Sequence, residues 1–306
     1  MGIDVPIVNA PMGGAAGGAL AAAVSRAGGL GMIGMGSSAT TAQLTAELQY
    51  VAALRRPFGI GLVHWVMSAN PELLEVAIAA KPAMLAVSFG ADWSWVRRAH
   101  DAGVPVAAQV ADVTAARRAV DAGVDVLVAR GAEGGGHGEP HVGTLPLLAE
   151  VLDEVSVPVL AAGGIASARG LAAVLAAGAS GAWLGTVFAG CAEAMTSTAV
   201  RNALAAASAD ATVTTRVFDV AQGYPWPATL PERVLSNEFV DRFDGHEADL
   251  DDEARAELDS AVAAEDYRVA PVNAGQGVGM VRESLPAADV LGRLCTGAER
   301  LLRRWG

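Results

Sequence analysis

"HDAGVPVAAQVADVTAARRAVDAGVDVLVA", residues 100–129, contains one complete structural repeat. It opens with "HDAGVPV" (100–106), and the similar "VDAGVDV" (120–126) follows twenty residues later. Between the two lies a helical pattern that begins on Asp112, a residue type favoured at helix N-caps, and ends at Gly123. An interval of twenty residues between the two similar segments is the length of one strand followed by one helix. This stretch therefore predicts that strand–helix units follow one another along the chain.

Short apolar runs mark eight candidate strands. They lie at 5–9, 30–34, 58–62, 84–88, 104–108, 125–129, 157–161 and 181–184. Each run is continuously apolar rather than alternating, as expected for parallel strands buried on both faces. Helical stretches lie between them, such as 71–80, which opens on Pro71, and 167–178, which opens on Ser167. Eight strand–helix units predict a (β/α)8 barrel, with a doubly wound open sheet as the alternative.

The strand–helix rhythm breaks after the eighth run. Residues 191–270 contain helical pieces, the loop "VFDVAQGYPWPATLPE" (217–232) and an acidic segment, and a final helix is expected at about 283–304. We therefore expect two parts: residues 1–190 and 271–306 form the barrel, and residues 191–270 form an insertion or cap after strand eight.

Charge and composition exclude several classes of protein. The net charge is −12, and the acidic segment 238–266, with twelve Asp or Glu against two Arg, accounts for −10 of it. No basic face for a nucleic acid is visible, and the acidic segment is typical of a solvated surface. Two isolated cysteines without metal-ligand spacing predict neither a disulfide framework nor a metal site.

No membrane or export segment is predicted. Residues 171–190 are uncharged over about a membrane span's length, but glycines and serines divide them into a helix, a turn and a strand. The N-terminal residues lack a signal-peptide pattern. We therefore expect a cytoplasmic protein without a membrane partner, and the sequence leaves a homodimer open.

Two glycine loops are candidates for a phosphate site. In a (β/α)8 barrel the active site lies on the loops that follow the strands. Gly163 and Gly164 follow the seventh run and precede the helix at Ser167, while Gly185 and Thr186 follow the eighth. Backbone N–H groups at such positions, aided by the positive end of a helix, bind phosphate. The two loops together therefore predict a phosphate-binding cradle.

A histidine stands in a third glycine loop, "RGAEGGGHG" (130–138). The loop follows the sixth run, so His137 is expected at the barrel mouth, where an imidazole can act as base, acid or hydrogen-bond donor near neutral pH. His64 follows the third run and is a weaker candidate to line the same mouth and contact substrate. His100 and His246 are expected on the surface.

At these motifs the sequence resembles the nitronate monooxygenases, or 2-nitropropane dioxygenases, which are FMN-dependent (β/α)8 enzymes. The resemblance extends over nearly the whole chain. It is carried by "NAPMGG" (9–14), "GGLGMIG" (28–34), "RGAEGGGHG" (130–138), "PVLAAGGIAS" (158–167), "GAWLGTVF" (181–188) and "AGQGVGM" (274–280). The glycine–histidine element is the most specific of these motifs.

The resemblance implies roles for individual residues. His137 matches the family's catalytic histidine. The expected FMN-binding positions are Ala10, Pro11, Met12, Gly13, Gln109, Arg130, Gly135, Gly136, Gly163, Gly164, Trp183, Leu184, Gly185 and Thr186.

This chain departs from the family at three positions. Gly134 stands where the family has alanine in its glycine–histidine element, and the other two departures change a polar position. Arg130 stands where the family often has glutamine, and Gly61 stands where it often has asparagine. A fixed positive charge at Arg130 would favour a reduced, anionic flavin. The departures bear on the identity of the substrate rather than on flavin binding.

The implied reaction is oxidation of alkyl nitronates by O2, with a carbonyl compound and nitrite as products. His137 would bind the nitronate or remove the α-proton of the neutral nitroalkane. A flavin-dependent NAD(P)H enoyl-acyl-carrier-protein reductase with the same fold is the nearest alternative. A non-catalytic flavin- or partner-binding protein, which uses the acidic segment as its surface, is another.

Overall fold

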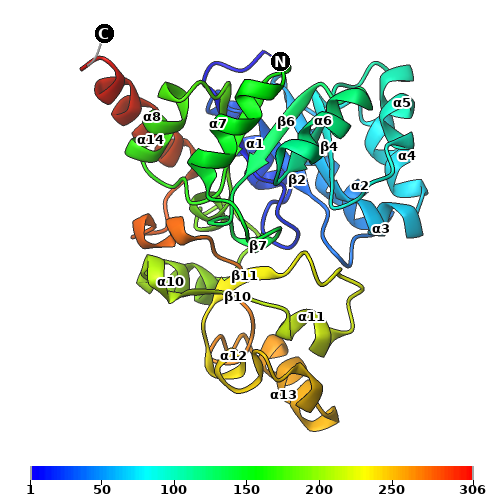
Figure 1. Cartoon of the computed structure of the whole chain (residues 1–306), viewed down its shortest axis with the longest axis vertical. Coiled ribbons are helices and arrows are strands. Elements are labelled where there is room, and N and C mark those ends of the chain that lie inside the picture. The colour runs from blue at the N-terminus through cyan, green and yellow to red at the C-terminus, as the bar shows by residue number, and fades with distance from the viewer. Residues whose placement is uncertain (1, 305–306) are drawn as a thin grey trace.

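The structure, a computed structural model, describes residues 2–304 and contains a parallel β-barrel surrounded by helices (Figure 1). The barrel strands are β1 (Ile7–Asn9), β2 (Gly31–Gly34), β3 (Phe58–Val63), β4 (Met84–Ser88), β5 (Val106–Val110), β6 (Val126–Arg130), β8 (Val159–Ala162) and β9 (Gly181–Leu184). They pair in the order β1-β9-β8-β6-β5-β4-β3-β2, and a parallel bridge between Val8 and Leu30 joins the first and last strands. This closure confirms the (β/α)8 prediction over the open sheet.

All eight predicted strands are present, but three of them begin two residues later than expected. Pro6, Pro105 and Pro158 precede these strands and have no N–H to donate to a ladder. Their carbonyl groups still accept bonds from Ala182, Leu85 and Leu127 of the neighbouring strands. The prolines thus flank the ladders that the apolar runs predicted.

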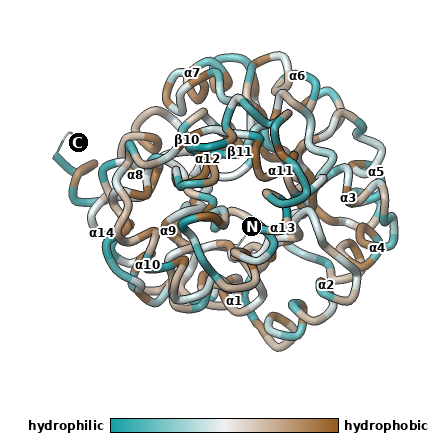
Figure 2. The backbone as a smooth tube through the Cα atoms, turned by 90° about the horizontal axis from the view of Figure 1, so that it is seen from below, coloured by the Kyte–Doolittle hydropathy of each residue, from teal (hydrophilic) through white to brown (hydrophobic). Residues whose placement is uncertain are grey.

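Helices cover the outside of the barrel, as the view from below shows (Figure 2). They are α1 (Gly18–Arg26), α2 (Thr41–Leu48), α3 (His64–Ala69), α4 (Glu72–Ala79), α5 (Ser94–Asp101), α6 (Val113–Asp121), α7 (Thr144–Glu154), α8 (Ala168–Ala176), α9 (Thr186–Ala189) and α14 (Ala287–Leu302). Asp112 and Ser167 cap α6 and α8 through their side chains, as predicted. The last helix begins at Ala287 rather than 283, because Pro286 disfavours helical backbone in the residue before it.

Alternate strand residues separate the barrel interior from the layer beneath the helices. Val126 and Val128 of β6 belong to an interior cluster with Trp183, whereas Leu127 and Ala129 pack in the larger cluster with the helices. Arg130 continues the interior series of β6, and Gln109 continues the series of Ala107 on β5. Both polar side chains therefore lie at the top of the barrel interior, at the carboxyl ends of the strands.

The insertion follows β9 and lies below the barrel in Figure 1. It contains α10 (Thr198–Ala206), η1 (Ala209–Ala211), β10 (Thr212–Thr215), α11 (Val217–Gln222), β11 (Glu232–Leu235), α12 (Glu238–Phe243), η2 (Glu247–Asp249) and α13 (Asp252–Ala263), and η3 (Gln276–Met280) leads back to α14. A separate hydrophobic cluster holds it together, with Phe218, Phe239 and Leu258 at its centre. The acidic segment forms η2, α12 and α13.

The insertion is joined to the barrel through a strand. β11 pairs with β10 on one side and on the other with β7 (Gly136–His137), which lies in the glycine loop after β6. No helix within residues 2–304 is long and apolar enough to cross a membrane, and residues 171–190 are divided among α8, β9 and α9.

Candidate active site

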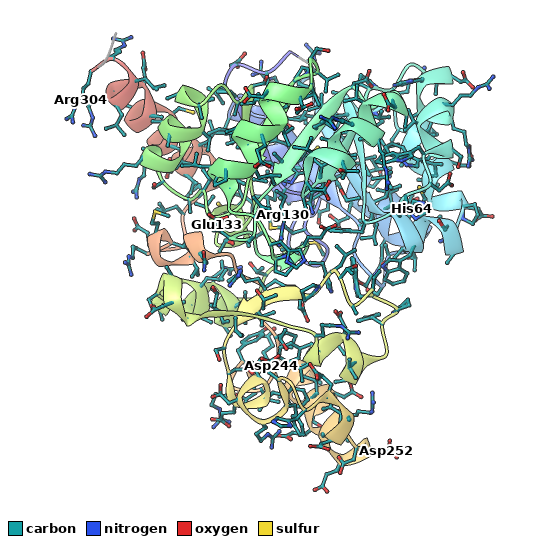
Figure 3. The ribbon with its side chains drawn as sticks, viewed as in Figure 1. His64, Arg130, Glu133, Asp244, Asp252 and Arg304 are labelled. Atoms are coloured by element: carbon teal, nitrogen blue, oxygen red, sulfur yellow. The ribbon has the colours of Figure 1, made fainter. Side chains whose placement is uncertain are left out.

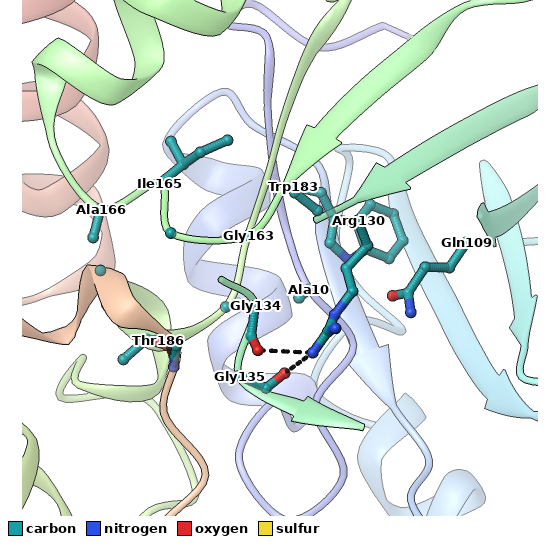
Figure 4. A pocket seen from close by; sticks show the side chains of 15 residues that line it. Ala10, Gln109, Arg130, Gly134, Gly135, Gly163, Ile165, Ala166, Trp183 and Thr186 are labelled. Atoms are coloured by element: carbon teal, nitrogen blue, oxygen red, sulfur yellow. Dashed lines mark hydrogen bonds between the residues drawn. The ribbon is translucent and has the colours of Figure 1, made fainter. Parts of the chain in front are cut away.

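A cavity opens at the carboxyl ends of the barrel strands (Figure 4). The empty space in it, together with the open solvent at its mouth, is about 480 Å³. It is lined by Ala10, Gln109, Arg130, Gly134, Gly135, Ala162, Gly163, Gly164, Ile165, Ala166, Trp183, Gly185, Thr186, Gly275 and Gly277. Residues from β1, β5, β6, β8, β9 and the segment before α14 therefore meet here.

One side of the cavity presents backbone donors that the protein does not use. The N–H groups of residues 163–166 donate no hydrogen bond within residues 2–304, and neither do those of Gly185 and Thr186. Gly163 and Gly164 have φ of +107° and +68°, which turn their amides away from the usual strand direction. N–H groups that are partly or fully shielded from water need a partner, and residues 163–166 lie just before Ser167, the N-cap of α8. We call residues 163–166 and 185–186 the phosphate cradle; they fit the phosphate of a flavin nucleotide.

The expected cofactor positions fall into two groups. Ala10, Gln109, Arg130, Gly135, Gly163, Gly164, Trp183, Gly185 and Thr186 line the cavity, while Pro11, Met12, Gly13, Gly136 and Leu184 do not. Leu184 is buried in the cluster beneath the helices. Their assignment to FMN stays a prediction.

The Gly61 departure has a steric cause. A Cβ at Gly61 would collide with the ring of Pro11, and a Cβ at Gly34 would collide with the backbone of Pro11 and Met12. The segment after β1 therefore packs directly on the ends of β2 and β3. An asparagine at position 61 would displace this segment from the position it has here.

The Arg130 departure shapes the glycine loop. Nη2 of Arg130 donates to the carbonyl oxygens of Gly134 at 2.7 Å, Gly135 at 3.2 Å and Gly136 at 3.0 Å. A Cβ at Gly134 would lie 2.6 Å from Nε, and one at Gly138 would collide with Nη1. The glycines of the loop thus make room for the guanidinium as well as for a ligand.

Arg130 also places a buried charge in the cavity. The side chain is 5% exposed and has no carboxylate within ion-pair distance among residues 2–304. Burial, with a smaller contribution from Arg233, lowers the pKa of Arg130 to about 10 against the opposing effect of Glu133. The guanidinium remains protonated at neutral pH. Figure 3 shows Arg130 and Glu133 at the end of the barrel that faces the insertion.

His137 contacts the insertion. Its Nε2 lies 3.0 Å from Oδ1 and 2.9 Å from Oδ2 of Asp219, which belongs to α11. The indole of Trp226 stacks on the imidazole, with the ring centroids 3.6 Å apart and the planes 9° apart. The side chains of His137 and Asp219 are 14% and 6% exposed. The imidazole is therefore fixed by a carboxylate at one nitrogen and by an aromatic ring on one face.

A second buried acid adjoins this pair. Glu232 of β11 stands opposite His137 in the strand register and is 4% exposed. Burial, and then the charge of Asp219, raise the pKa of Glu232 to about 8. Ligand atoms of His137, Asp219 and Glu232 lie within 4.8 Å of one another, so this set also has the chemistry of a cation site. The expectation of no metal stays a prediction.

None of the five histidines, His137 included, is among the residues that line the cavity. His64 begins α3 directly after β3, and its buried Nε2 has no hydrogen-bond partner among residues 2–304. It does not line the cavity, and its role with substrate stays a prediction. His100 is half-exposed and pairs with Asp125 at 2.9 Å, and His246 is exposed, as expected.

Trp226 links the imidazole to an aromatic group. The Trp226 ring lies edge-on to Trp65 and Phe89, at centroid distances of 5.7 Å and 5.0 Å. Its Nε1 donates to Oγ of Ser37 after β2. The loop 217–232 is thereby anchored to the barrel on the side of His137.

Reasoning from sequence missed Asp219, Trp226 and Glu232. All three lie in the loop "VFDVAQGYPWPATLPE", but the chain separation between His137 and Asp219 is 82 residues. No spacing rule connects residues so far apart. The available signal was the rarity of acidic residues in this apolar loop, which contains Asp219 and Glu232 alone.

Known proteins match both the sequence and the fold. The nitronate monooxygenase family profile matches residues 1–77 and 65–297. A nitronate monooxygenase of Pseudomonas aeruginosa is 32% identical over 95% of each chain. The (3aS,4S,5R,7aS)-5-hydroxy-7a-methyl-1-oxo-octahydro-1H-indene-4-carboxyl-CoA dehydrogenase of Mycobacterium tuberculosis is 33% identical over 80% of this chain, which spans 66% of that enzyme's length.

A solved structure has the same fold over nearly the whole chain. FabK from Thermotoga maritima has a TM-score of 0.85 and 30% sequence identity, and the match covers 99% of this chain and 95% of that one. The match of the family profile to nearly the whole chain, with a nitronate monooxygenase relative at full coverage, establishes the relationship. This chain belongs to the nitronate monooxygenase family and is a flavin-dependent oxidoreductase.

Proposed function

We propose that the enzyme uses FMN to oxidise alkyl nitronates, or the parent nitroalkanes, with O2 to a carbonyl compound and nitrite. The observation that carries this proposal is the His137–Asp219 pair, two residues along the chain from the cavity-lining Gly135. A base held by a carboxylate beside a cavity at the carboxyl ends of the barrel strands is the arrangement that removal of an acidic C–H proton requires.

The cavity supports FMN rather than a dinucleotide. One phosphate cradle is present, and residues 163–166 and 185–186 would hold the phosphate through their backbone N–H groups. Gln109, Arg130 and Trp183 would lie at the opposite side, where an isoalloxazine ring needs polar edges and an apolar face. When bound, FMN supplies the redox chemistry by accepting electrons from the substrate and delivering them to O2.

His137 would act as the base. With its Nε2–H donated to Asp219, the lone pair remains on Nδ1. Nδ1 takes the α-proton of the neutral nitroalkane: the C–H bond breaks, an N–H bond forms, and the electron pair remains on the substrate as the nitronate. The imidazolium that forms is stabilised by the Asp219 carboxylate.

Arg130 would attract the anion that results. Its guanidinium is protonated at neutral pH, lines the cavity, and lacks a carboxylate partner within residues 2–304. Among those residues only Nη2 makes hydrogen bonds, so Nε and Nη1 remain available to an anionic substrate or to an anionic ring. The Gln-to-Arg departure thus favours a negatively charged reactant.

A reductase or dehydrogenase that acts on a thioester is the second candidate. It is favoured by the 33% identity to the carboxyl-CoA dehydrogenase of M. tuberculosis. Such an enzyme exchanges electrons with a nicotinamide cofactor rather than with O2.

One experiment separates the two candidates. The purified enzyme is reduced anaerobically with propyl-2-nitronate or with NADPH, and the flavin spectrum is followed in each case. Reduction by the nitronate, with nitrite released once O2 is admitted, supports the proposal. Reduction by NADPH alone, reversed by an enoyl thioester, overturns it.

A further inference from the structure

Two buried acids of the insertion share one basic neighbour. The side chains of Asp219 and Glu232 are almost inaccessible, and both carboxylate oxygens of Asp219 lie within hydrogen-bond distance of Nε2 of His137. Asp219 lies on α11 and Glu232 on β11, while His137 lies on β7, so three separate elements bring the groups together.

The nearby arginines donate their hydrogen bonds to groups other than the two acids. Arg255 of α13 donates to the carbonyl oxygens of Val220 and Ala221. Arg233 of β11 donates to Ala132 and Thr212, and Arg130 donates to the glycine loop. Within residues 2–304, neither Asp219 nor Glu232 pairs with an arginine or lysine. Two carboxyl groups therefore face one imidazole without a permanent counter-charge.

Electrostatics decides how such a pair is protonated. Two buried carboxylates a few ångströms apart cannot both ionise cheaply, so one retains a proton. Both oxygens of Asp219 are directed at Nε2 of His137, which favours the ionised form of Asp219. The proton then resides on Glu232, in accord with the raised pKa of that carboxyl.

We propose that Asp219 and Glu232 hold one proton between them at neutral pH and thereby position His137 in the tautomer that leaves Nδ1 free to act as base. This inference rests on the proposed role of His137. It makes both acids positioning residues and makes the insertion a part of the active site. The stacked Trp226 restricts rotation of the same ring, which keeps Nε2 on the carboxylate.

The proposal predicts different behaviour for the two acids. Asp219→Asn replaces a carboxylate, which can only accept, by an amide whose NH2 can also donate, and an NH2 that donates to Nε2 moves the ring proton to Nδ1. Glu232→Gln keeps the neutral form that the parent has at pH 7. Only Asp219→Asn should therefore change the tautomer at pH 7, and only Glu232→Gln should abolish the ionisation of this carboxyl, which Asp219→Asn should shift to lower pH.

The test is NMR of the flavin-loaded full-length enzyme labelled with 15N-histidine, titrated from pH 5.5 to 9.5. His137→Asn assigns the signal. In the parent we expect the Nε2–H tautomer and, near pH 8, a change in the His137 chemical shifts as Glu232 ionises. Asp219→Asn should show the opposite or a mixed tautomer. Glu232→Gln should show the parent tautomer without the change near pH 8. Asp219→Glu should restore the parent tautomer. Asp244→Asn, at an exposed acid of the insertion that Figure 3 labels, should match the parent.

Three results would overturn the proposal. They are an unchanged tautomer in Asp219→Asn, a step near pH 8 that survives in Glu232→Gln, and selective loss of the His137 signal on addition of Mn²⁺, which would identify a cation site instead. Flavin content and circular dichroism show whether each variant is folded.

Turnover gives a second readout. Asp219→Asn should lower kcat/KM for neutral nitroalkane by about 10²–10⁴-fold and should affect pre-formed nitronate far less, since that substrate needs no base. A collapse of the site would lower both equally and would contradict a positioning role. If the parent itself oxidises neither form, the proposed function fails, while the NMR titration still decides the present inference.

Discussion

The phosphate cradle and the surroundings of His137 adjoin the same mouth of the barrel, but they are built differently. The cradle consists of backbone N–H groups from two loops, each of which follows its strand directly. The surroundings of His137 consist of side chains from α11, β11 and the loop between them, at least 82 residues further along the chain. The first arrangement depends on glycine and the second on the docking of the insertion.

From this difference we expect the two regions to fail separately. Changes at His137 or its partners should leave the cradle intact, and changes in the cradle should leave the base intact. The predictions below use that independence.

The largest effect is expected from His137→Asn. The asparagine cannot act as a base at neutral pH, so turnover of neutral nitroalkane should fall by about 10²–10⁴-fold, and turnover of pre-formed nitronate should fall less. Flavin content should not change, because backbone groups of other loops form the cradle. Both substrates are assayed under saturating O2. His100→Asn, at the half-exposed histidine that pairs with Asp125, is the control and should behave as the parent.

The outcome also tests the division between the two regions. Loss of flavin from His137→Asn would show that the cradle depends on the insertion. Equal losses on both substrates would assign His137 to binding rather than to proton removal.

The barrel, the glycine loops after its strands and the place of His137 in the loop after β6 could be predicted because short-range patterns specify them. Continuous apolar runs and capped helices predicted every barrel strand, and some strands begin late because Pro105 and Pro158 have no N–H to donate to the ladder. Glycine pairs after the strands predicted the loops that line the cavity.

The partners of His137 could not be predicted from such patterns. Their approach depends on the pairing of β11 with β7, a strand of only two residues inside a glycine loop. The role of Arg130 in the loop was also invisible, because its bonds go to backbone carbonyls that carry no sequence signature. Long-range contacts of side chains require the fold itself.

Arg130→Gln should produce the second largest effect, on stability. The shorter, neutral glutamine side chain cannot donate hydrogen bonds to the carbonyl groups of Gly134, Gly135 and Gly136 together. Hydrogen bonds of a charged donor contribute about 1.5–3 kcal/mol, so we expect the free energy of unfolding to fall by about 2–4 kcal/mol. Urea unfolding measures it. Arg117→Gln, at an exposed pair with Glu154, should change it by less than about 1 kcal/mol.

A result within experimental error of the parent would mean that the glycine loop holds its shape without the guanidinium. The positive charge of Arg130 would then interact with the bound ligand and would not be needed to shape the loop.

Gly185→Val tests the cradle, with a smaller expected effect. Gly185 has a negative φ of −99°, and a Cβ there would lie 3.5 Å from Met12 and 3.8 Å from Ala10, so the protein itself has room for a side chain. A valine would occupy the cavity beside two unused N–H groups. We expect FMN affinity to fall about 30-fold, or about 2 kcal/mol, without loss of thermal stability in the flavin-free protein. Fluorescence titration with FMN measures it.

Gly292→Ala is the matched control for the cradle. This glycine lies in α14, and a Cβ there meets nothing within 4 Å. FMN affinity should equal that of the parent. Unchanged affinity in Gly185→Val as well would place the phosphate elsewhere.

The smallest effect concerns Glu232 and the pH dependence of stability. Burial and Asp219 raise the pKa of this carboxyl from 4.5 to about 8, so between these values the folded protein keeps a proton that the unfolded chain has released. The stability contributed by this proton is present at low pH and is lost as the pH rises, at about 1.4 kcal/mol per pH unit. Glu232→Gln has no such proton. Its free energy of unfolding relative to the parent should therefore rise by about 1 kcal/mol between pH 6 and pH 7 and stop rising above about pH 8. Urea unfolding of both proteins at each pH measures this difference, in which all other titrating groups cancel. Asp244→Asn should show a difference that does not vary with pH. If the difference in free energy of unfolding between Glu232→Gln and the parent also does not vary with pH, Glu232 ionises in the folded protein as it does in water. Asp219 and Glu232 would then not share one proton next to His137.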